Sequence, residues 1–165
     1  MCDQQEKGDS MKILVVSDTH RHIEKMHLAA ELEKPDMILH LGDHDSDAIE
    51  LARRMPNIDI CYVKGNCDAF SDSALSYCCT FDGVTIFAAH GHKYQVKSGL
   101  LSFGYAAMEQ GAQVALFGHT HVPFCQKRGE MWLMNPGTCG SYRASYGIVE
   151  IQNGSVSCRV VEGNL

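Results

Sequence analysis

Two histidines, His119 and His121, stand one residue apart just after an apolar run. The run at residues 113–116 predicts a short buried strand, and Gly118 allows the chain to turn where the strand ends. On extended backbone, residues i and i+2 point the same way, so both imidazoles are predicted to face one point beyond the strand. Imidazole is the commonest side-chain ligand of transition metals. Metal binding is therefore the candidate chemistry, and two polar loop residues are the alternative.

The same order of strand, small residue and ligand-type side chain recurs four times earlier in the chain. Consecutive candidates lie 23 to 29 residues apart, about the length of a strand plus its return connection. In open α/β sheets, sites form outside the carboxyl ends of the strands, so these side chains are expected to meet there. The earlier candidates are Asp18 with His20, Asp43 after Gly42, Asn66 after Gly65, and His90.

Hydrophobic periodicity and turn residues predict an α/β chain whose second half is antiparallel or mixed. Acidic and hydroxyl side chains at the predicted helix starts indicate caps, with Asp18 before the first helix, Asp45 and Asp47 in the second, and Ser98 in the third. Helices are expected at residues 23–32, 44–54 and 98–110. Strands are expected at 12–16, 36–41, 58–63, 74–81, 84–89, 113–116, 122–126, 131–134, 146–151 and 155–161.

Length and composition indicate one globular domain. The chain has 165 residues, 45% of them hydrophobic and 21% charged, with a net charge of −6. An acidic chain offers no electrostatic footprint for nucleic acid or an anionic membrane, and no apolar run is long enough to cross a bilayer. Residues 1–10 are polar and predict a disordered extension or vector-derived segment, with Met11 as an alternative start. Residues 11–165 form the predicted domain.

Cysteine usage favours a reducing compartment. The eight cysteines show neither a Cys-x-x-Cys pair nor the spacing of a disulfide framework. We therefore expect reduced and mostly packed thiols in a cytoplasmic protein.

The five motifs together resemble the calcineurin-like metallophosphoesterases, and most closely the small bacterial and archaeal phosphodiesterases of that family. The resemblance runs from the first strand to Asn135-Pro136-Gly137 and so covers nearly the whole chain. It implies an α/β sandwich in which two mixed β-sheets pack face to face with helices outside. It also implies a hydrolase of a small phosphodiester, with in-line attack on phosphorus by a metal-bridging hydroxide. A phosphomonoesterase, or a non-catalytic protein-binding scaffold with this fold, is the alternative.

Carried over position by position, the resemblance implies two divalent transition-metal ions. Nitrogen and oxygen ligands suit manganese best among the candidates, with nickel, iron or zinc also acceptable. Asn66 and His119 are further expected to orient the substrate phosphate. In this assignment Asp18, His20 and His121 hold one ion, Asn66, His90 and His119 hold the other, and Asp43 bridges them.

Cys67 departs from the family pattern, because many members have histidine directly after the Gly-Asn pair. A thiol is a weak hydrogen-bond donor with an ordinary pKa of about 8.5. Cys67 is therefore a candidate catalytic residue that limits hydrolysis to diesters or good leaving groups, and a small packing residue is the alternative. Further candidates for contact with the ligands or with substrate are His44, Asp68, His92 and Arg143. A nuclease is disfavoured by the lack of a basic stripe, and a homo-oligomer stays open.

Overall fold

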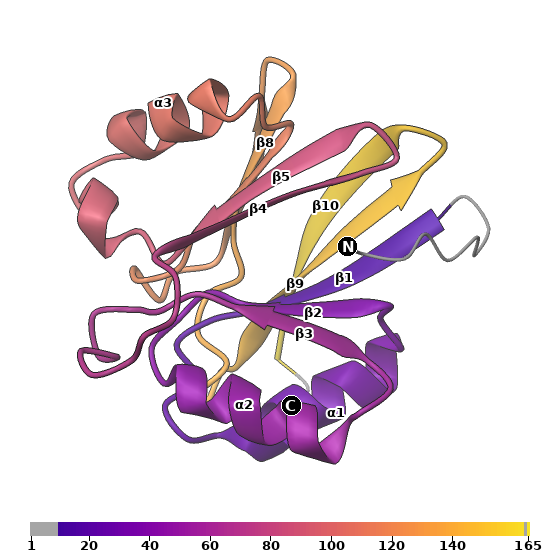
Figure 1. Ribbon diagram of the computed structural model, residues 1–165, viewed down its shortest axis with the longest axis vertical. Coiled ribbons are helices and arrows are strands. Elements are labelled where there is room, and N and C mark those ends of the chain that lie inside the picture. Colours follow the sequence, from indigo (N-terminus) through magenta and orange to yellow (C-terminus); the bar gives the residue numbers. More distant parts are fainter. Residues whose placement is uncertain (1–9, 164) are drawn as a thin grey trace.

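Ten strands and four helical segments make up the part of the chain that the computed structural model describes, residues 10–163 and 165 (Figure 1). The helices are α1 (Ile23–Glu33), α2 (Asp45–Arg54), the short 3₁₀ helix η1 (His92–Tyr94) and α3 (Leu101–Glu109). The strands are β1 (Ser10–Val16), β2 (Met37–His40), β3 (Asp59–Tyr62), β4 (Ser76–Phe81), β5 (Val84–Ala89), β6 (Val114–Leu116), β7 (Phe124–Arg128), β8 (Met131–Asn135), β9 (Ser145–Gln152) and β10 (Ser155–Glu162).

The strands form two five-stranded sheets, both of mixed direction. The first sheet has the order β10-β9-β1-β2-β3, with β1, β2 and β3 parallel and the other pairs antiparallel. The second has the order β4-β5-β6-β8-β7, with β5, β6 and β8 parallel. Two mixed sheets with outer helices are the fold class predicted from the sequence, which is confirmed.

Three apolar layers hold the sheets and helices together. Alternate side chains of β1 enter different layers: Val15 lies between the two sheets, whereas Leu14 packs toward α1 and α2. Both are fully buried, which explains why β1 reads as a continuous apolar run. On the other outer face, Phe103 of α3 packs on the second sheet with Phe117. Figure 1 shows α1 and α2 along the first sheet and α3 beside the second.

Two predictions at the ends of elements are wrong. Ser10 begins β1 and pairs with Gln152, so the predicted extension does not include it, and its other nine residues lie outside the described part. Helix α3 begins at Leu101 rather than at residue 98, and no side chain caps it. Ser98 instead donates its backbone N–H to the Gln95 carbonyl in the turn that follows η1. This turn was missed because η1 is too short for a periodic signal.

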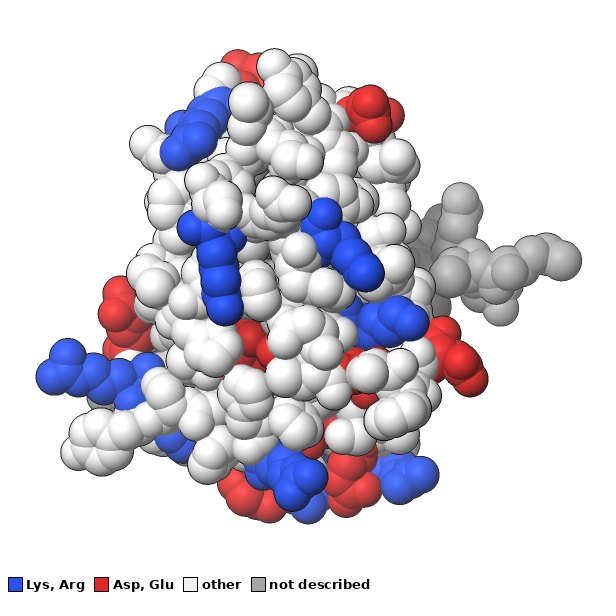
Figure 2. All heavy atoms as spheres, turned by 90° about the vertical axis from the view of Figure 1, so that its left-hand side faces the viewer, with Lys and Arg blue, Asp and Glu red and all other residues white. Residues whose placement is uncertain are grey.

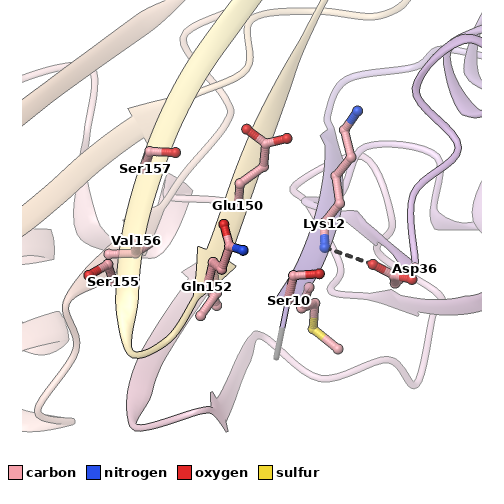
Figure 3. A pocket seen from close by; sticks show the side chains of 10 residues that line it. Ser10, Lys12, Asp36, Glu150, Gln152, Ser155, Val156 and Ser157 are labelled. Atoms are coloured by element: carbon pink, nitrogen blue, oxygen red, sulfur yellow. Dashed lines mark hydrogen bonds between the residues drawn. The ribbon is translucent and has the colours of Figure 1, made fainter. Parts of the chain in front are cut away.

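A cavity of about 580 Å³ lies at the amino end of β1, far along the strand from the residues with candidate chemistry (Figure 3). Its lining includes Lys12, Asp36 and Glu150 and mixes charged with apolar side chains. It contains none of the predicted site residues. Within the described residues, no helix is long and apolar enough to cross a membrane.

Candidate functional site

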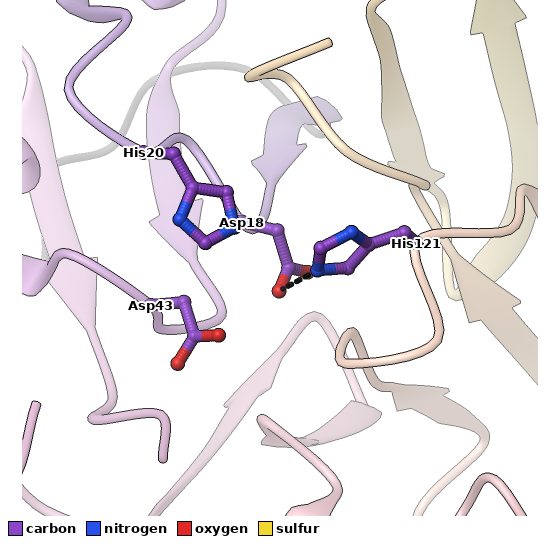
Figure 4. Close-up of side chains that lie close together, drawn as sticks. All are labelled: Asp18, His20, Asp43 and His121. Atoms are coloured by element: carbon purple, nitrogen blue, oxygen red, sulfur yellow. Dashed lines mark ion pairs between the residues drawn. The ribbon is translucent and has the colours of Figure 1, made fainter. Parts of the chain in front are cut away.

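Four predicted ligands meet at the carboxyl ends of the strands. One ligand atom from each of Asp18, His20, Asp43 and His121 lies within 4.8 Å of the others. Figure 4 shows the four side chains directed toward one space, with Asp18 and His20 in the loop after β1, Asp43 in the loop after β2 and His121 in the loop after β6. His121 Nε2 lies 3.0 Å from Asp18 Oδ1. Asp18 is fully buried, whereas His121 is 45% exposed, so the cluster has a closed floor and an open rim.

The other predicted ligands lie beside this cluster and share Asp43 with it. His90 Nε2 is 3.5 Å from Asp43 Oδ1 and 3.1 Å from Asn66 Oδ1. The rings of His90 and His119 have centroids 5.0 Å apart. His90 is fully buried and Asn66 is exposed. The fold therefore brings together all seven predicted metal ligands, although only the first four form a tight cluster.

The contacts of His90 indicate where a cation would fit. Its Nδ1 lies 2.8 Å from the Leu41 carbonyl oxygen, which can only accept, so Nδ1 carries a proton. In the neutral ring, the Nε2 lone pair then faces the Asn66 Oδ1 acceptor, a contact that a cation would satisfy. The buried Asp18 Oδ1 likewise receives no hydrogen bond within the described residues. Orphaned acceptors and a donor set of nitrogen and oxygen fit divalent transition metals.

The ligand loops are not extended, which corrects the prediction for the last motif. The φ angles of His119 and His121 are +66° and +61°, in the left-handed region. Asp18, His20 and Asp43 also have positive φ. Left-handed backbone is uncommon for residues with a side chain and marks local strain that the surroundings must hold. The two imidazoles therefore converge through sharp turns, not through the alternation of a strand.

Close packing between loops explains two glycines of the motifs. A Cβ at Gly65 would collide with Asp43 Oδ1 and with the Asp43 backbone nitrogen. A Cβ at Gly118 would collide with Ser17 Oγ and lie 3.0 Å from Asp18 Oδ2. Each glycine thus lets one ligand loop lie against another.

Asp68 ties two ligand loops together. Its carboxylate accepts the backbone N–H groups of Asp43, His44, Asp45 and Gly65 at 2.7–3.2 Å. It therefore both supports the loop that presents Asp43 and satisfies the amino end of α2, which the sequence had left undecided. A buried carboxylate with four such bonds is a strong local clamp.

Asp18, Asp45 and Asp47 do not occupy the cap positions of the helices, contrary to prediction, although Asp45 and Asp47 do lie in the first turn of α2. His22 and His44 occupy the cap positions of α1 and α2, and neither cap makes a side-chain hydrogen bond. Asp45 accepts hydrogen bonds from Ser71 and Ser73, and Asp47 accepts the hydroxyl of Thr19 at 2.6 Å. These carboxylates are buried and join α2 to neighbouring loops.

Charged groups are unevenly distributed over the face of the molecule at the carboxyl ends of the strands, where the predicted ligands lie. Figure 2 shows recessed acidic side chains surrounded by uncharged ones, with lysine and arginine side chains above and beside them. An acidic recess within a partly basic rim suits a bound cation and an approaching anion.

The family follows from a match over most of the chain. Residues 11–154 match the calcineurin-like phosphoesterase superfamily domain. The chain belongs to this superfamily. The predicted resemblance is therefore confirmed.

Relatives of this superfamily extend the comparison to sequence and structure. The probable metallophosphoesterase YsnB of Bacillus subtilis strain 168 is 31% identical over 156 residues, covering 90% of this chain and 89% of that protein. The phosphodiesterase MJ0936 of Methanocaldococcus jannaschii is 27% identical, covering 80% of this chain and 86% of its own. The fold is shared with Vps29 of Entamoeba histolytica complexed with zinc, at a TM-score of 0.74 and 19% identity over 92% of this chain and 99% of that one.

Ionisation in the phosphoesterase site favours an anionic Asp43 and a neutral His119. Burial alone would raise the pKa of Asp43, but the Cys67 backbone N–H at 2.9 Å and the nearby His90 outweigh it and hold that pKa below its usual value. Burial, with His90 and Lys97 nearby, lowers the pKa of His119. A neutral imidazole keeps a lone pair for a metal ion.

Cys67 lies at the open side of the same carboxylate. It is exposed, and its thiol neighbours Asp43. Burial of its sulfur and the negative charge of Asp43 raise the pKa of Cys67. The thiol therefore stays protonated at neutral pH and is a weaker acid than an ordinary cysteine.

The remaining predicted contacts divide into two groups. His44 and His92 lie at the site: the His44 ring centroid is 5.2 Å from that of His20, and the His92 centroid is 5.4 Å from that of His90. Arg143 is exposed and makes no hydrogen bond or ion pair within residues 10–163 and 165. The structure thus brings the two histidines to the ligands and gives Arg143 no such contact.

Sequence reasoning missed His40. This residue is fully buried at the end of β2, three positions before Asp43. Burial lowers the pKa of His40 to about 4, against four nearby carboxylates that raise it. The sequence did contain an indication of this role: His40 stands within the apolar run of residues 36–41, and a histidine in a strand buried on both faces needs polar partners.

Proposed function

We propose that the chain is a metal-dependent phosphodiesterase that hydrolyses small phosphodiesters. The observation that carries this proposal is the gathering of Asp18, His20, Asp43 and His121 around one space, with a buried carboxylate oxygen at its floor that receives no hydrogen bond. Superfamily membership and relatives named phosphodiesterase support the same activity.

We infer a dinuclear site in which Asp18, His20 and His121 hold one ion, Asn66, His90 and His119 the other, and Asp43 both. Mixed imidazole, amide and carboxylate ligands favour manganese, with nickel, iron and zinc as further candidates. When bound, two such ions supply a hydroxide nucleophile at neutral pH and polarise a phosphoryl oxygen. The two carboxylates among these ligands, Asp18 and Asp43, do not neutralise the charge of two divalent ions, so the ligand shell would keep a net positive charge that attracts an anion.

The chain's own residues then bind and orient the substrate. The Asn66 amide is exposed at the rim, and the His119 ring is half-buried beside His90, so both can reach a phosphate held over the ligands. Asp68 and the glycines around Asp43 keep the bridging carboxylate in place. His44 and His92 lie close enough to the ligands to move a proton, and the exposed Arg143 is a further candidate for contact with the substrate phosphate.

Cys67 favours diesters over monoesters. A monoester with a poor leaving group needs a good acid to protonate the departing oxygen, and a thiol with a raised pKa is a poor one. A diester carries less negative charge than a monoester, so its hydrolysis depends less on an acid at residue 67. We therefore expect slower hydrolysis of monoesters than of diesters.

A non-catalytic scaffold is the second candidate, because Vps29 structures share the fold. The complete ligand set in this chain favours the enzyme. The acidic chain makes nucleic acid an unsuitable partner, a homo-oligomer stays open, and the seven free thiols among the described residues suit a reducing cytoplasm.

The deciding experiment compares bis(p-nitrophenyl) phosphate with p-nitrophenyl phosphate, using chelator-treated protein with and without Mn²⁺. Manganese-dependent cleavage that is faster on the diester supports the proposal. The Cys67→His variant should gain monoesterase activity, with Cys78→Ser, an exposed thiol on β4, as the control. Equal cleavage of both substrates would reject the role of Cys67, and no cleavage with any of the four metals would favour the scaffold.

A further inference from the structure

We propose that His40 is a positioning residue that holds the loop bearing Asp18 and the loop bearing Asp43 at a fixed separation. It does so through a buried chain of hydrogen bonds that continues to Thr19 and Asp47. The inference rests on the proposed metal site, because the two loops matter as carriers of its ligands. His40 itself touches neither a ligand side chain nor the space between the ligands.

The hydrogen bonds of His40 define its tautomer. The backbone N–H of Gly42 donates to His40 Nδ1 at 3.1 Å, so this nitrogen must be unprotonated. The proton of the neutral ring then sits on Nε2, which lies 2.9 Å from Thr19 Oγ1. His40 therefore accepts from one ligand loop and donates to the other. The low pKa of His40 agrees with a ring that stays neutral.

Beyond Thr19 the hydrogen bonds continue chiefly to Asp47, and the Asp43 carbonyl oxygen lies 3.5 Å from Thr19 Oγ1 as a more distant second acceptor. Because Thr19 Oγ1 accepts from His40, its own hydrogen is free to donate, and Asp47 Oδ2 lies 2.6 Å away. Asp47 also accepts the backbone N–H of Arg21 at 2.7 Å. His40, Thr19 and Asp47 are 0%, 0% and 3% exposed, so bulk water does not compete for these bonds.

The loops need such a restraint because their backbones are strained. Asp18 and Asp43 have φ angles of +52° and +59°, and Thr19 stands between two ligands. Backbone bonds already link the loops, for example Asp18 N–H to the Gly42 carbonyl at 3.0 Å. The side-chain link through His40 fixes the rotation of the Thr19 turn, on which the direction of the Asp18 carboxylate depends. Removing it should loosen the metal site more than it unfolds the protein.

The first test reads the tautomer directly in metal-free wild-type protein. Long-range proton–nitrogen spectra of the imidazoles should show one histidine as the neutral Nε2–H form, with a slowly exchanging proton, whose signal disappears in His40→Asn. An Nδ1–H form or an imidazolium at pH 7 would overturn the assignment. This measurement does not depend on activity, so it stands even if the proposed function fails.

The second test measures Mn²⁺ affinity by calorimetry. His40→Asn keeps an acceptor for the Gly42 N–H but has no donor at the position of Nε2, within reach of Thr19. Thr19→Val removes the hydroxyl. Each variant should weaken Mn²⁺ binding by about 10- to 100-fold. The double variant should lose no more Mn²⁺ affinity than the weaker-binding single variant, because each single variant already breaks the same series of hydrogen bonds. Thr19→Ser should restore wild-type affinity.

A matched control separates positioning from general loss of stability. Ile38→Ala truncates a fully buried apolar side chain on the same strand and should lower the free energy of unfolding while leaving Mn²⁺ affinity unchanged. Folded His40→Asn protein with wild-type affinity would refute the proposal. So would equal losses of affinity in Ile38→Ala and His40→Asn. Absence of Mn²⁺ binding and diester cleavage in the wild type would reject the proposed function instead.

Discussion

The two halves of the candidate metal centre differ in how closely the fold gathers their ligand atoms. In the first half, atoms from Asp18, His20, Asp43 and His121 lie within 4.8 Å of one another. In the second half, His90 Nε2 and Asn66 Oδ1 face each other as acceptors, and Asn66 is exposed. The first half is thus formed by loops already in position, and the second depends on a cation to join its ligands.

The supports of the two halves explain the difference. Buried carboxylates and His40 tie the first-sheet loops together, as Asp68 does with four backbone N–H groups. Both halves span the two sheets, but the second takes two of its ligands, His90 and His119, from the second sheet. Its ties are the bond from His90 Nδ1 to the Leu41 carbonyl, that from the Gly118 N–H to the His90 carbonyl, and that from the His119 N–H to Asp18 Oδ2 at 3.2 Å. A preorganised site binds more tightly, so the first half should fill at lower metal concentration.

Asp43 is the residue that both halves share, so its replacement should have the largest effect. Asp43→Asn removes the negative charge but keeps the shape, and we expect diester hydrolysis to fall by about 1,000-fold, the equivalent of several kcal/mol of lost transition-state stabilisation. Steady-state rates at saturating Mn²⁺ measure it. Asp59→Asn, at an exposed carboxylate that begins β3, should leave the rate unchanged. A rate within tenfold of wild type would remove Asp43 from the centre.

Single ligands of each half should separate the two ions. His121→Ala should abolish the tighter binding step, and His90→Ala the weaker one, each lowering hydrolysis by about 100-fold. Calorimetric titration with Mn²⁺ gives both stoichiometry and order. Loss of the tighter step in His90→Ala would reverse the proposed ranking of the halves.

The glycines at the loop contacts test the packing of each half. Gly65→Ala forces a Cβ into Asp43, and Gly118→Ala forces one into Ser17, so each should lower the free energy of unfolding by about 1–3 kcal/mol. Gly104→Ala is the matched control, because its Cβ meets nothing within 4 Å inside α3; it should raise stability by about 0.5–1 kcal/mol. Denaturant titration measures all three. Neutral effects at residues 65 and 118 would show that the loops separate at little cost.

The pH dependence of stability tests His40, the buried support of the first half. Its folded pKa of about 4 lies below the unfolded value of about 6.5, so the unfolded state takes up the proton first as pH falls. The contribution is fully present above pH 6.5 and is lost as pH falls toward 4, about 1–2 kcal/mol of it between pH 7 and 5. Asp47, Asp18, Asp68 and Asp45 face His40 and oppose the shift. Metal-free His40→Asn should lack this slope; an identical slope in both proteins would contradict a neutral His40.

Much of the architecture could be predicted because it depends on local pattern. The apolar run at residues 12–16 and the turn at Asp82-Gly83 predicted a buried strand and a hairpin, and both are confirmed. Sequence could not identify Asp47 as a partner of Thr19, because the two residues are 28 positions apart and only the packing of α2 beside α1 brings them together. It equally misassigned His119 and His121 to extended backbone, since a left-handed turn leaves no hydrophobic period to read.

The sequence by itself determined which residue types stand at the strand ends, and with them the family and the predicted ligand set. Strand alternation and ligand chemistry are properties of short stretches of sequence, so they can be predicted without a structure. Only the tertiary structure decided how the ligands divide into a tight half and a looser one, and that His40 and Asp68 support them. Those outcomes depend on which backbone N–H, carbonyl or hydroxyl lies within about 3 Å of a buried side chain, and folding alone brings such distant groups into contact.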